Sequence, residues 1–413
     1  MFLYNLVVLL YGCVIRLASF NNTKAKLWVS GRKNWRTTLQ EKISKIKNEK
    51  KIWVHCASLG EFEQGRPLIE AIRKKHPQYK IVLTFFSPSG FEASKNYAHA
   101  EVIAYLPLDT KRNARDFMSI VKPHMAIFIK YEFWINFLNV LKSSKTPSYL
   151  VSAVFKDHHP FFKWYGKIFV RSLQAFNILF VQEKHSKELL QKIGYTNVEI
   201  CGDTRFDRVL EIKGNFTPIP EIEKFKGSAK LILGGSTWPG DEDLMIEAFK
   251  KLNDPNIKLV LAPHEIKKSS IDDLQQKLER NGLKFCLFTE GVNIESNVLI
   301  LNTIGMLSRS YSYANMAYVG GGFNDGIHNI LEPAVYFIPV AFFGTNYHKF
   351  NEAVDLVKLQ GAFNVLSAEE LYQHWQKVLQ NTSEKERISF VLQGYFSSNG
   401  NVTSKVMSVI DFG

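Results

Sequence analysis

Short apolar runs alternate with longer amphipathic segments along most of the 413-residue chain. Between residues 51 and 181 the apolar runs are KIWVHC, KIVLTFF, EVIAYL, MAIFI, SYLVSAV and FNILFV, and segments with a helical pattern, such as 61–75 and 111–121, separate them. Continuous apolar runs of this length are typical of strands buried on both faces, and strands that alternate with helices form parallel sheets. The pattern therefore predicts an α/β fold with helices on both faces of a parallel sheet.

The alternation stops between residues 211 and 230 and then starts again. This stretch, EIKGNFTPIPEIEKFKGSAK, contains glycines, prolines and charges without an apolar period, which is typical of an interdomain linker. The later apolar runs are KLILGGS, IKLVLAPH, KFCLF, NVLILN, MAYVGGG and FIPVAFFG. We therefore predict two Rossmann-like domains that face each other across a cleft, residues 21–212 and 213–390, with a C-terminal helix in 391–413 that packs back on the first domain.

The first 20 residues, MFLYNLVVLLYGCVIRLASF, form an apolar segment. Spanning a bilayer requires about 20 such residues, so this segment is barely long enough. Five cations follow it: Lys24, Lys26, Arg32, Lys33 and Arg36. Cations after an apolar segment favour a cytoplasmic location for the following chain and bind anionic lipid. We predict a membrane anchor that either spans the bilayer or lies in its interface; the alternative is a first buried helix of the core.

The charge balance points to an anionic partner. Lys and Arg number 52 against 39 Asp and Glu, a formal net charge of +13. Nucleic acid, phospholipid headgroups and a phosphorylated substrate all fit this charge. A nucleic-acid binder would interleave cations with exposed aromatic residues, whereas the aromatic residues here lie mostly inside apolar runs. The four cysteines have neither metal-ligand nor redox spacing, which favours a reducing compartment.

Glu61 lies just after the first apolar strand, in the segment KIWVHCASLGEFEQGRPLIEAI. A small-residue turn separates it from the strand, and the following helix begins near it. A carboxylate in the first turn of a helix complements the helix dipole. The carboxyl ends of strands in open α/β sheets are also where ligands bind, so the position permits a functional role as well.

Two glycine-rich turns in the second half are candidates for binding phosphate. In LILGGSTWPGDEDLMIEAF, the turn Gly235-Ser236-Thr237 precedes a helix predicted to start near Pro239; it offers amides and hydroxyls to an anion, but it also fits a simple capped turn. In MAYVGGGFNDGIHNILEPAV, a helix is predicted to start near His328, with Glu332 on the same face one turn later. A carboxylate there can hold two ribose hydroxyls while amides hold phosphate, which favours a nucleotide site.

Six motifs carry a family resemblance: ASLGE, YEFWIN, CGDTRFD, GGSTWPGDE, NTIGML and GGGFNDGIHNILEPA. Their order resembles that of the lipid A Kdo transferases, the 3-deoxy-D-manno-octulosonic acid (Kdo) transferases of Gram-negative lipopolysaccharide synthesis, from the N-terminus to about Phe343. The resemblance implies the two-domain GT-B glycosyltransferase fold. It also implies inverting transfer of Kdo from CMP-Kdo to a lipid A precursor (lipid IVA) at the cytoplasmic face of the inner membrane, without nucleic acid as a partner.

The resemblance also implies site residues. Glu61 matches the family's general base, Glu132 of YEFWIN matches a Glu near the reaction centre, and Arg205 of CGDTRFD stands where the family has a Lys that can offset charge on the leaving phosphate. Glu132 also fits a helix cap, and Arg205 also fits a surface pair with Asp203 or Asp207. The predicted donor contacts are Gly235, Ser236, Thr237, Pro263, His264, Gly305, Met306, Leu307, Asn329, Ile330, Leu331 and Glu332.

Three tracts depart from the family pattern. APHEIKKSS stands where the family reads Pro-Arg-His, GML replaces a Gly-Glu-Leu-like triplet, and SAVFKDHH replaces a Ser-Arg-Ser tract. We expect no cofactor beyond the donor substrate and no metal, because no His, Asp or Glu cluster has ligand spacing. Another GT-B nucleotide-sugar transferase or a nucleotide-sugar epimerase remains an alternative, and a non-catalytic basic anion-binding protein a more distant one.

Overall fold

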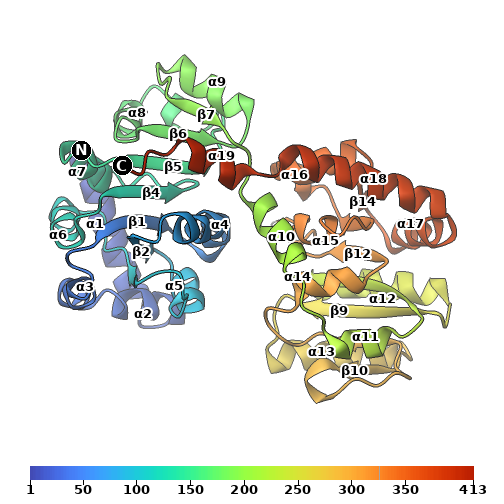
Figure 1. Ribbon diagram of the computed structural model, residues 1–413. Coiled ribbons are helices and arrows are strands. Elements are labelled where there is room, and N and C mark those ends of the chain that lie inside the picture. The colour runs from blue at the N-terminus through green and yellow to red at the C-terminus, as the bar shows by residue number, and fades with distance from the viewer. Residues whose placement is uncertain (325) are drawn as a thin grey trace. The chain divides into compact units, whose positions relative to one another are not determined.

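The computed structural model describes residues 1–324 and 326–413 and divides the chain into two compact units. The first unit comprises Met1–Arg208 and Gly400–Gly413, and the second comprises Val209–Asn399. Each unit contains one seven-stranded sheet, and Figure 1 shows helices packed against both faces of each sheet. All strand pairs in the described residues are parallel, which confirms the predicted α/β architecture.

The first sheet has the strand order β3-β2-β1-β4-β5-β6-β7. Its strands are β1 Lys50–Cys56, β2 Tyr79–Phe85, β3 Val102–Tyr105, β4 Met125–Ile129, β5 Ser148–Ala153, β6 Ile178–Val181 and β7 Val198–Ile200. The helices of this unit are α1 Phe2–Ala18, α2 Thr23–Ser30, α3 Trp35–Ser44, α4 Leu59–Lys75, α5 Pro88–Ser94, α6 Lys111–Val121, α7 Ile135–Ser143, α8 Lys167–Leu173, α9 Lys184–Lys192 and α19 Val402–Val409.

The second sheet has the strand order β10-β11-β9-β8-β12-β13-β14. Its strands are β8 Lys230–Thr237, β9 Ile257–Pro263, β10 Phe285–Leu287, β11 Val298–Ile300, β12 Met316–Val319, β13 Val340–Phe343 and β14 Ala362–Val365. Its helices are α11 Pro220–Lys226, α12 Pro239–Leu252, α13 Lys268–Arg280, α14 Leu307–Ser310, α15 Leu331–Ala334, α16 Asn351–Lys358, α17 Ala368–Gln380 and α18 Thr382–Asn399. The predicted start of a helix near Pro239 is confirmed by α12.

The division between the units falls inside a helix. Helix α10, Arg205–Gly214, begins in the first unit and ends in the second, and α11 occupies part of the stretch 211–230 that was predicted as linker. The chain returns to the first unit at Gly400 (Figure 1). There Val402, Val406 and Met407 of α19 join the hydrophobic cluster on one face of the first sheet.

Strand β1 explains how the first sheet is buried on both faces. Side chains of a strand alternate between the two faces, so Ile52, Val54 and Cys56 enter one hydrophobic cluster while Trp53 enters the other. All four side chains are at most 1% exposed. His55 follows the same alternation as Trp53 and is therefore carried on the Trp53 face at the end of the strand.

Both sheets change winding direction at a central pair of strands. In the first sheet the order reverses between β1 and β4, and in the second between β8 and β12. Ligands of open α/β sheets bind outside the carboxyl ends of the strands at this position, because the connections leave it in opposite directions and open a crevice. The segments after β1 and β4, and after β8 and β12, are therefore where a site is expected in each unit.

Helix α1 is neither wholly buried nor free of the first unit. The Tyr4 hydroxyl donates to Asp109 Oδ2 at 2.5 Å, and the side-chain Nδ2 of Asn136 donates to Asn5 Oδ1 at 2.9 Å. Most of the exposed surface of the helix is apolar, although Arg16 in its last turn is exposed too. The large exposed apolar side chains include Phe2, Leu3, Leu6, Val7, Leu9, Leu10, Val14 and Leu17. Within the described residues, no helix is long and apolar enough to cross a membrane.

Two of the five cations after α1 are engaged by the protein itself. The Arg32 guanidinium donates to the carbonyls of Leu106 at 2.9 Å and Phe86 at 2.7 Å, and burial lowers its pKa to about 9. Arg36 pairs with Asp116 at 2.7 Å. The other three cations, Lys24, Lys26 and Lys33, are exposed. Binding of this segment to anionic lipid stays a prediction.

Candidate active site

Glu61 lies at the carboxyl edge of the first sheet, in the first turn of α4. Ser58 is the N-cap of α4, and its amide donates to Glu61 Oε2 at 2.9 Å. Together with the Ser58 hydroxyl, which faces the third residue of the helix, this forms a capping box. The cap holds the carboxylate next to the end of β1, so the sequence Ser-x-x-Glu accounts for its position.

The surroundings of Glu61 suit a proton acceptor. Burial raises the pKa of Glu61 to about 7, and the negative charge of Glu132 acts in the same direction. The amides of Ser58 and Ala57 and the charge of Lys130 oppose this rise. A carboxylate with a pKa near neutrality is partly charged at pH 7 and binds a proton more readily than an ordinary glutamate, which general-base chemistry requires.

Glu132 comes from the segment after β4, the strand next to β1. Its Oε2 accepts a hydrogen bond from the Trp134 indole and lies 3.0 Å from His55 Nε2. The side chain is 7% exposed. Trp134, not Glu132, is the N-cap residue of α7. The alternative that Glu132 is only a helix cap is therefore wrong, and the structure brings Glu132 and Glu61 to the same edge of the sheet.

Arg205 lies at the start of α10 and is paired within the unit. Its Nε donates to Asp203 Oδ2 at 2.8 Å, and its Nη2 lies 2.6 Å from the same oxygen. Asp203 is buried and also accepts from Gln64 Nε2 at 3.2 Å. Burial raises the pKa of Tyr131, on which the charges of both Arg205 and Glu61 act. Arg205 is thus held by Asp203, and its charge and that of Glu61 both act on Tyr131. Its catalytic role stays a prediction.

The end of β4 has an unusual backbone. Lys130 has φ +68°, a left-handed conformation that is uncommon for residues other than glycine. Its amide donates to the carbonyl of Val151 on β5 at 2.8 Å, so the sheet maintains this conformation. Such backbone geometry is concentrated at functional sites. Here it turns the chain out of the sheet and leads directly into Tyr131 and Glu132.

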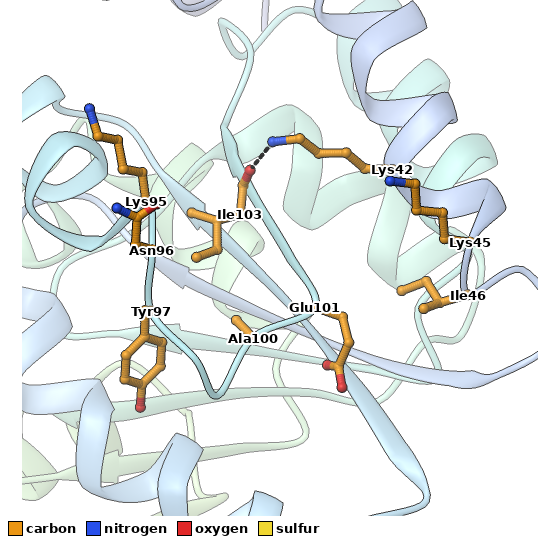
Figure 2. A pocket seen from close by; sticks show the side chains of 9 residues that line it. All are labelled: Lys42, Lys45, Ile46, Lys95, Asn96, Tyr97, Ala100, Glu101 and Ile103. Carbon is orange, nitrogen blue, oxygen red and sulfur yellow. Dashed lines mark hydrogen bonds between the residues drawn. The ribbon is translucent and has the colours of Figure 1, made fainter.

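A separate hollow of about 380 Å³ lies on the first unit between α3 and the chain around β3 (Figure 2). Its lining includes Lys42, Lys45, Lys95 and Glu101. Figure 2 shows Lys42 donating to the carbonyl of Ile103, at 2.8 Å. Burial and the charge of Lys45 lower the pKa of Lys42. None of the predicted site residues lines this hollow, which separates it from the glutamate edge.

In the second unit, the last residues of β8, which lead into the turn before α12, are shaped by close packing. Ser236 has φ +53°, and a Cβ on Gly235 would lie 1.8 Å from the Tyr311 hydroxyl, so only glycine fits there. The carbonyl of Thr237 accepts from the amide of His264 at 2.9 Å. The predicted residues Gly235, Ser236 and Thr237 therefore lie beside Pro263 and His264, which end β9 and follow it.

Three aromatic rings stack beside this turn. His264 lies between Trp238, at a centroid distance of 4.7 Å, and His328, at 4.4 Å. The Trp238 indole donates to His328 Nε2 at 3.1 Å, so a neutral His328 carries its proton on Nδ1. Burial and His264 lower the pKa of His328 to about 4. His328 is therefore neutral at pH 7 and offers an N–H donor rather than a positive charge.

The helix predicted to start near His328 starts later and is short. Helix α15 comprises only Leu331–Ala334, so the predicted start near His328 is wrong, and one turn of helix has little dipole. That amides of this segment hold phosphate stays a prediction. The amide of His328 instead donates to the carbonyl of Gly320 at 3.0 Å. Asp325, within the glycine-rich motif, lies outside the described residues.

Glu332 remains well placed for a polar ligand. Its Oε2 accepts a hydrogen bond from the Ser308 hydroxyl at 2.7 Å, and its Oε1 accepts one from the side-chain Nδ2 of Asn329 at 3.2 Å. The Asn329 side-chain oxygen in turn accepts from the amide of Leu331 at 3.3 Å. These bonds hold the Glu332 carboxylate in place between α14 and the segment before α15.

The predicted triplet Gly305-Met306-Leu307 forms the start of α14. Gly305 has φ +84°, and Met306 is the N-cap residue. The Met306 carbonyl accepts from the amide of Ser310 at 3.0 Å and from its hydroxyl at 2.9 Å. The triplet thus positions Ser308, which holds Glu332, while Ile330 and Leu331 are buried at 1% exposure or less. Ile330 and Leu331 therefore support the site from within the core.

Sequence reasoning missed four residues that organise these sites: His55, Asp241, Ser308 and Trp238. The carboxylate of Asp241 accepts hydrogen bonds from three residues, Trp238, Tyr318 and Gly321. His55 is the second-to-last residue of β1, so its place next to the small-residue turn was a signal of the sheet edge. In the part of the chain that the structure describes, no group of three or more His, Cys, Asp or Glu is arranged to hold a metal ion.

Sequence comparison finds one protein family. The profile of the family described as 3-Deoxy-D-manno-octulosonic-acid transferase (kdotransferase) matches residues 33–208. A 3-deoxy-D-manno-octulosonic acid transferase of Aquifex aeolicus is 29% identical over 330 residues, 78% of this chain and 83% of the relative. The transferase of the same name from Haemophilus influenzae is 26% identical over 356 residues, 82% and 81% of the two chains.

Structure comparison finds a similar fold in a solved structure. The UDP-GlcNAc 2-epimerase of Neisseria meningitidis superposes with a TM-score of 0.61 over 87% of this chain and 98% of its own, at 14% identity. At this identity the likeness concerns the fold alone. It agrees with the predicted GT-B type of architecture, two parallel-sheet α/β domains.

Proposed function

We propose that this chain, which belongs to the 3-deoxy-D-manno-octulosonic acid transferase family, transfers Kdo from CMP-Kdo to a lipid A precursor such as lipid IVA. The observation that carries the proposal is the pair Glu61 and Glu132 at the point where the first sheet reverses its strand order. Burial and Glu132 together raise the pKa of Glu61 to about 7, which suits a group that removes a proton from a sugar hydroxyl.

In the proposed reaction, Glu61 acts as general base. It takes the proton of the acceptor hydroxyl while that oxygen bonds to the anomeric carbon of Kdo, and the bond from this carbon to the CMP phosphate oxygen breaks. CMP leaves with the electron pair, and attack from the opposite face inverts the anomeric centre. The group opposing the new negative charge is proposed to be Arg205, whose guanidinium Asp203 orients.

We propose that the second unit holds the donor nucleotide. The crevice of its sheet is bordered by the turns after β8 and β12, and Glu332, Ser308 and Asn329 stand beside them. A carboxylate accepts from two vicinal ribose hydroxyls, which suits Glu332. The stacked rings of Trp238, His264 and His328 provide an aromatic surface and an N–H donor without positive charge.

The decisive experiment supplies the purified protein with CMP-Kdo, generated in situ, and with lipid IVA in detergent. The expected product is the acceptor with added Kdo, detected by mass spectrometry, together with CMP. Chelating divalent cations should leave the rate unchanged, because we propose a reaction without a metal. A parallel incubation with UDP-GlcNAc tests the epimerase alternative; epimer formation without Kdo transfer would contradict the proposal.

We propose that α1 lies in the interface of the cytoplasmic leaflet of the inner membrane. Its exposed apolar side chains include Phe2, 83% exposed, and Leu3, 71% exposed, while Tyr4 and Asn5 fix the opposite side to the first unit. An amphipathic helix that turns its apolar side away from the protein has the character of an interfacial element. The exposed Lys24, Lys26 and Lys33 add attraction to anionic headgroups.

Replacing Leu3, Leu10 and Val14 together by Ser should detach the protein from membranes. The three side chains are more than half exposed, so the folded unit is retained while the apolar surface available to lipid shrinks. Cosedimentation with anionic phospholipid vesicles should fall by about tenfold or more. Transfer to detergent-dispersed acceptor should stay within about twofold of the original protein.

Phe390→Ser is the matched control for that experiment. Phe390 is an exposed apolar residue of α18 in the second unit, 78% exposed, and it should not affect vesicle binding. If the triple variant binds vesicles as well as the original protein and the control do, α1 is not the membrane contact.

Glu332→Ala should weaken CMP binding by about 1.5–3 kcal/mol, roughly tenfold to over a hundredfold, because hydrogen bonds to a charged group are lost. Titration calorimetry with CMP measures this directly. Glu265→Ala is the control, since Glu265 is an exposed residue of the same unit that pairs with Lys267 at 3.0 Å. Equal CMP affinity of the Glu332 and Glu265 variants would remove Glu332 from the proposed nucleotide site.

A further inference from the structure

His55 is a fully buried imidazole that the proposed reaction does not use directly. It lies near the end of β1, on the face of the sheet that carries Trp53, and its exposed fraction is 0%. Both ring nitrogens have polar partners inside the protein. An imidazole removed from water keeps its orientation only if these partners satisfy it, so the bonds decide what His55 can do.

The Nδ1 side of the ring is fixed by Thr84 on the neighbouring strand β2. Nδ1 lies 3.1 Å from the Thr84 carbonyl oxygen and 2.9 Å from its hydroxyl oxygen. A carbonyl oxygen only accepts, so the proton lies on Nδ1. The indole of Trp53 donates to the Thr84 hydroxyl at 2.7 Å and holds this group in turn. Thr84 of β2, itself held by Trp53 of β1, therefore fixes the orientation of the imidazole ring.

The Nε2 side of the ring faces Glu132. Nε2 lies 3.0 Å from Glu132 Oε2, and Trp134 Nε1 lies 3.1 Å from Nε2 and donates to the same Oε2. This contact attaches Glu132, which follows β4, to β1 through His55.

We propose that His55 is a positioning residue for transfer: it holds the carboxylate of Glu132 at the end of β4, where its charge acts on Glu61. This inference rests on the proposed function, because Glu61 is the base of that reaction. Core packing alone does not require a histidine at position 55. An apolar side chain would fill the same space without the cost of burying two polar ring atoms.

Other groups face this pair from each surrounding element: Cys56 on β1, Glu61 and Glu63 on α4, Lys130 and Tyr131 after β4, and Tyr4 on α1. Burial raises the pKa of Cys56, of Tyr131 and of Tyr4, so all three stay neutral between pH 5 and 8. Lys130 keeps its positive charge over that range. Cys56, Tyr131 and Tyr4 therefore do not obscure the titration of Glu61.

Two substitutions of His55 separate its two bonds. His55→Asn places an amide near Nδ1 and keeps a donor for Thr84, but it removes the partner of Glu132. His55→Gln places an amide N–H near Nε2 and keeps the bond to Glu132. We expect kcat/KM of the Asn variant at pH 7 to fall about tenfold, while the Gln variant stays within about threefold.

The pH dependence distinguishes positioning from a purely structural role. In the Asn variant, Glu132 loses the contact that holds its carboxylate at the end of β4, so its charge acts less strongly on Glu61 and the pKa of Glu61 falls. The acidic limb of the kcat/KM profile should move to lower pH by about one unit, whereas the Gln variant should keep the original limb. His185→Asn, at an exposed histidine paired with Asp157, should leave the profile unchanged.

A second measurement does not depend on transfer activity. The carboxyl ¹³C resonance of Glu61, assigned with Glu61→Gln, is titrated in the original protein and in both His55 variants. A lower midpoint in the Asn variant alone supports the inference even if no Kdo is transferred, an outcome that would overturn only the proposed function. The same midpoint in all three folded proteins, as judged by circular dichroism, overturns the positioning role of His55.

Discussion

Glu61→Gln abolishes Kdo transfer while the protein stays folded: we expect kcat/KM to fall by about 10²–10⁴-fold, the loss typical of removing a general base. Gln is also accepted at the third helical position of a capping box, so the cap with Ser58 persists. Ala would remove the cap and confuse a loss of stability with a loss of chemistry. The measurement is the initial rate of product formation by mass spectrometry.

The pH profile of the unsubstituted enzyme belongs to the same prediction. Glu61 must be deprotonated to accept a proton, and its pKa is raised to about 7 by burial and by Glu132. The rate of transfer should therefore fall as the pH drops below about 7. A group with a raised folded pKa gives stability at low pH that is lost as the pH rises through that value. Glu61→Gln should thus gain stability relative to the original protein above pH 7.

Glu63→Gln is the control on the same helix. Glu63 lies two residues further along α4, is 40% exposed at its side chain and contacts Arg208 at 3.2 Å. Its loss should change the transfer rate by no more than about twofold. A Glu61→Gln variant that turns over like the Glu63 control would exclude Glu61 as the base and would return it to the role of a helix cap.

The order of strands and helices could be predicted from the sequence, but not which strands are neighbours. Apolar runs mark β1 and β4 clearly, yet nothing local shows that β4 lies next to β1 while β2 lies on its other side. That arrangement depends on how the crossover helices pack. It is also what brings Glu132 to the same edge as Glu61, so the pairing of the two glutamates followed from resemblance and from the structure, not from spacing.

The pattern of apolar and polar residues is too short to predict the shortest strands and helices. Strand β7 comprises three residues, Val198–Ile200, of which only Val198 is buried, so it has no apolar run to detect. The start of α15 was misplaced for another reason. His328 donates its amide to Gly320 and stacks its ring on His264, and these tertiary contacts replace a helical turn. Pro333 was the available signal, since proline is tolerated in the first turn of a helix.

Helix α1 illustrates a choice that sequence left open. The apolar segment fitted an anchor or a buried core helix, and the structure shows a helix attached along one side only. Tyr4, Asn5 and Val8 contact or face the first unit, while the other sides are exposed. Tyr4 and Asn5 near the start of the helix were the signal that one side of it is attached to the first unit. A segment that only spans lipid does not need polar side chains that bond to buried partners.

The substitution expected to lower the free energy of unfolding most lies in the acidic run at the start of α12. Asp241 and Asp243 both complement the helix dipole, and sequence reasoning treated them alike. Only the structure distinguishes them. Asp241 is 0% exposed and accepts from the amides of Trp238 and Gly321, each at 2.9 Å, and from the Tyr318 hydroxyl at 2.7 Å. It thereby joins the turn after β8 to the loop after β12.

Asp241→Ala should destabilise the protein by about 3–5 kcal/mol, because it leaves buried donors on Trp238, Gly321 and Tyr318 without an acceptor. Both turns bordering the proposed nucleotide site lose their common anchor, so CMP affinity should fall with stability. Asp243→Ala is the matched control on the same helix; its side chain is 64% exposed and pairs with Lys277 at 2.9 Å, so its loss should cost no more than about 1 kcal/mol. Urea unfolding measures both changes. Equal urea midpoints for the two variants would show that the hydrogen bonds of the buried Asp241 carboxylate add no more to the free energy of unfolding than the exposed Asp243 does. The carboxylate would then not hold the two turns together.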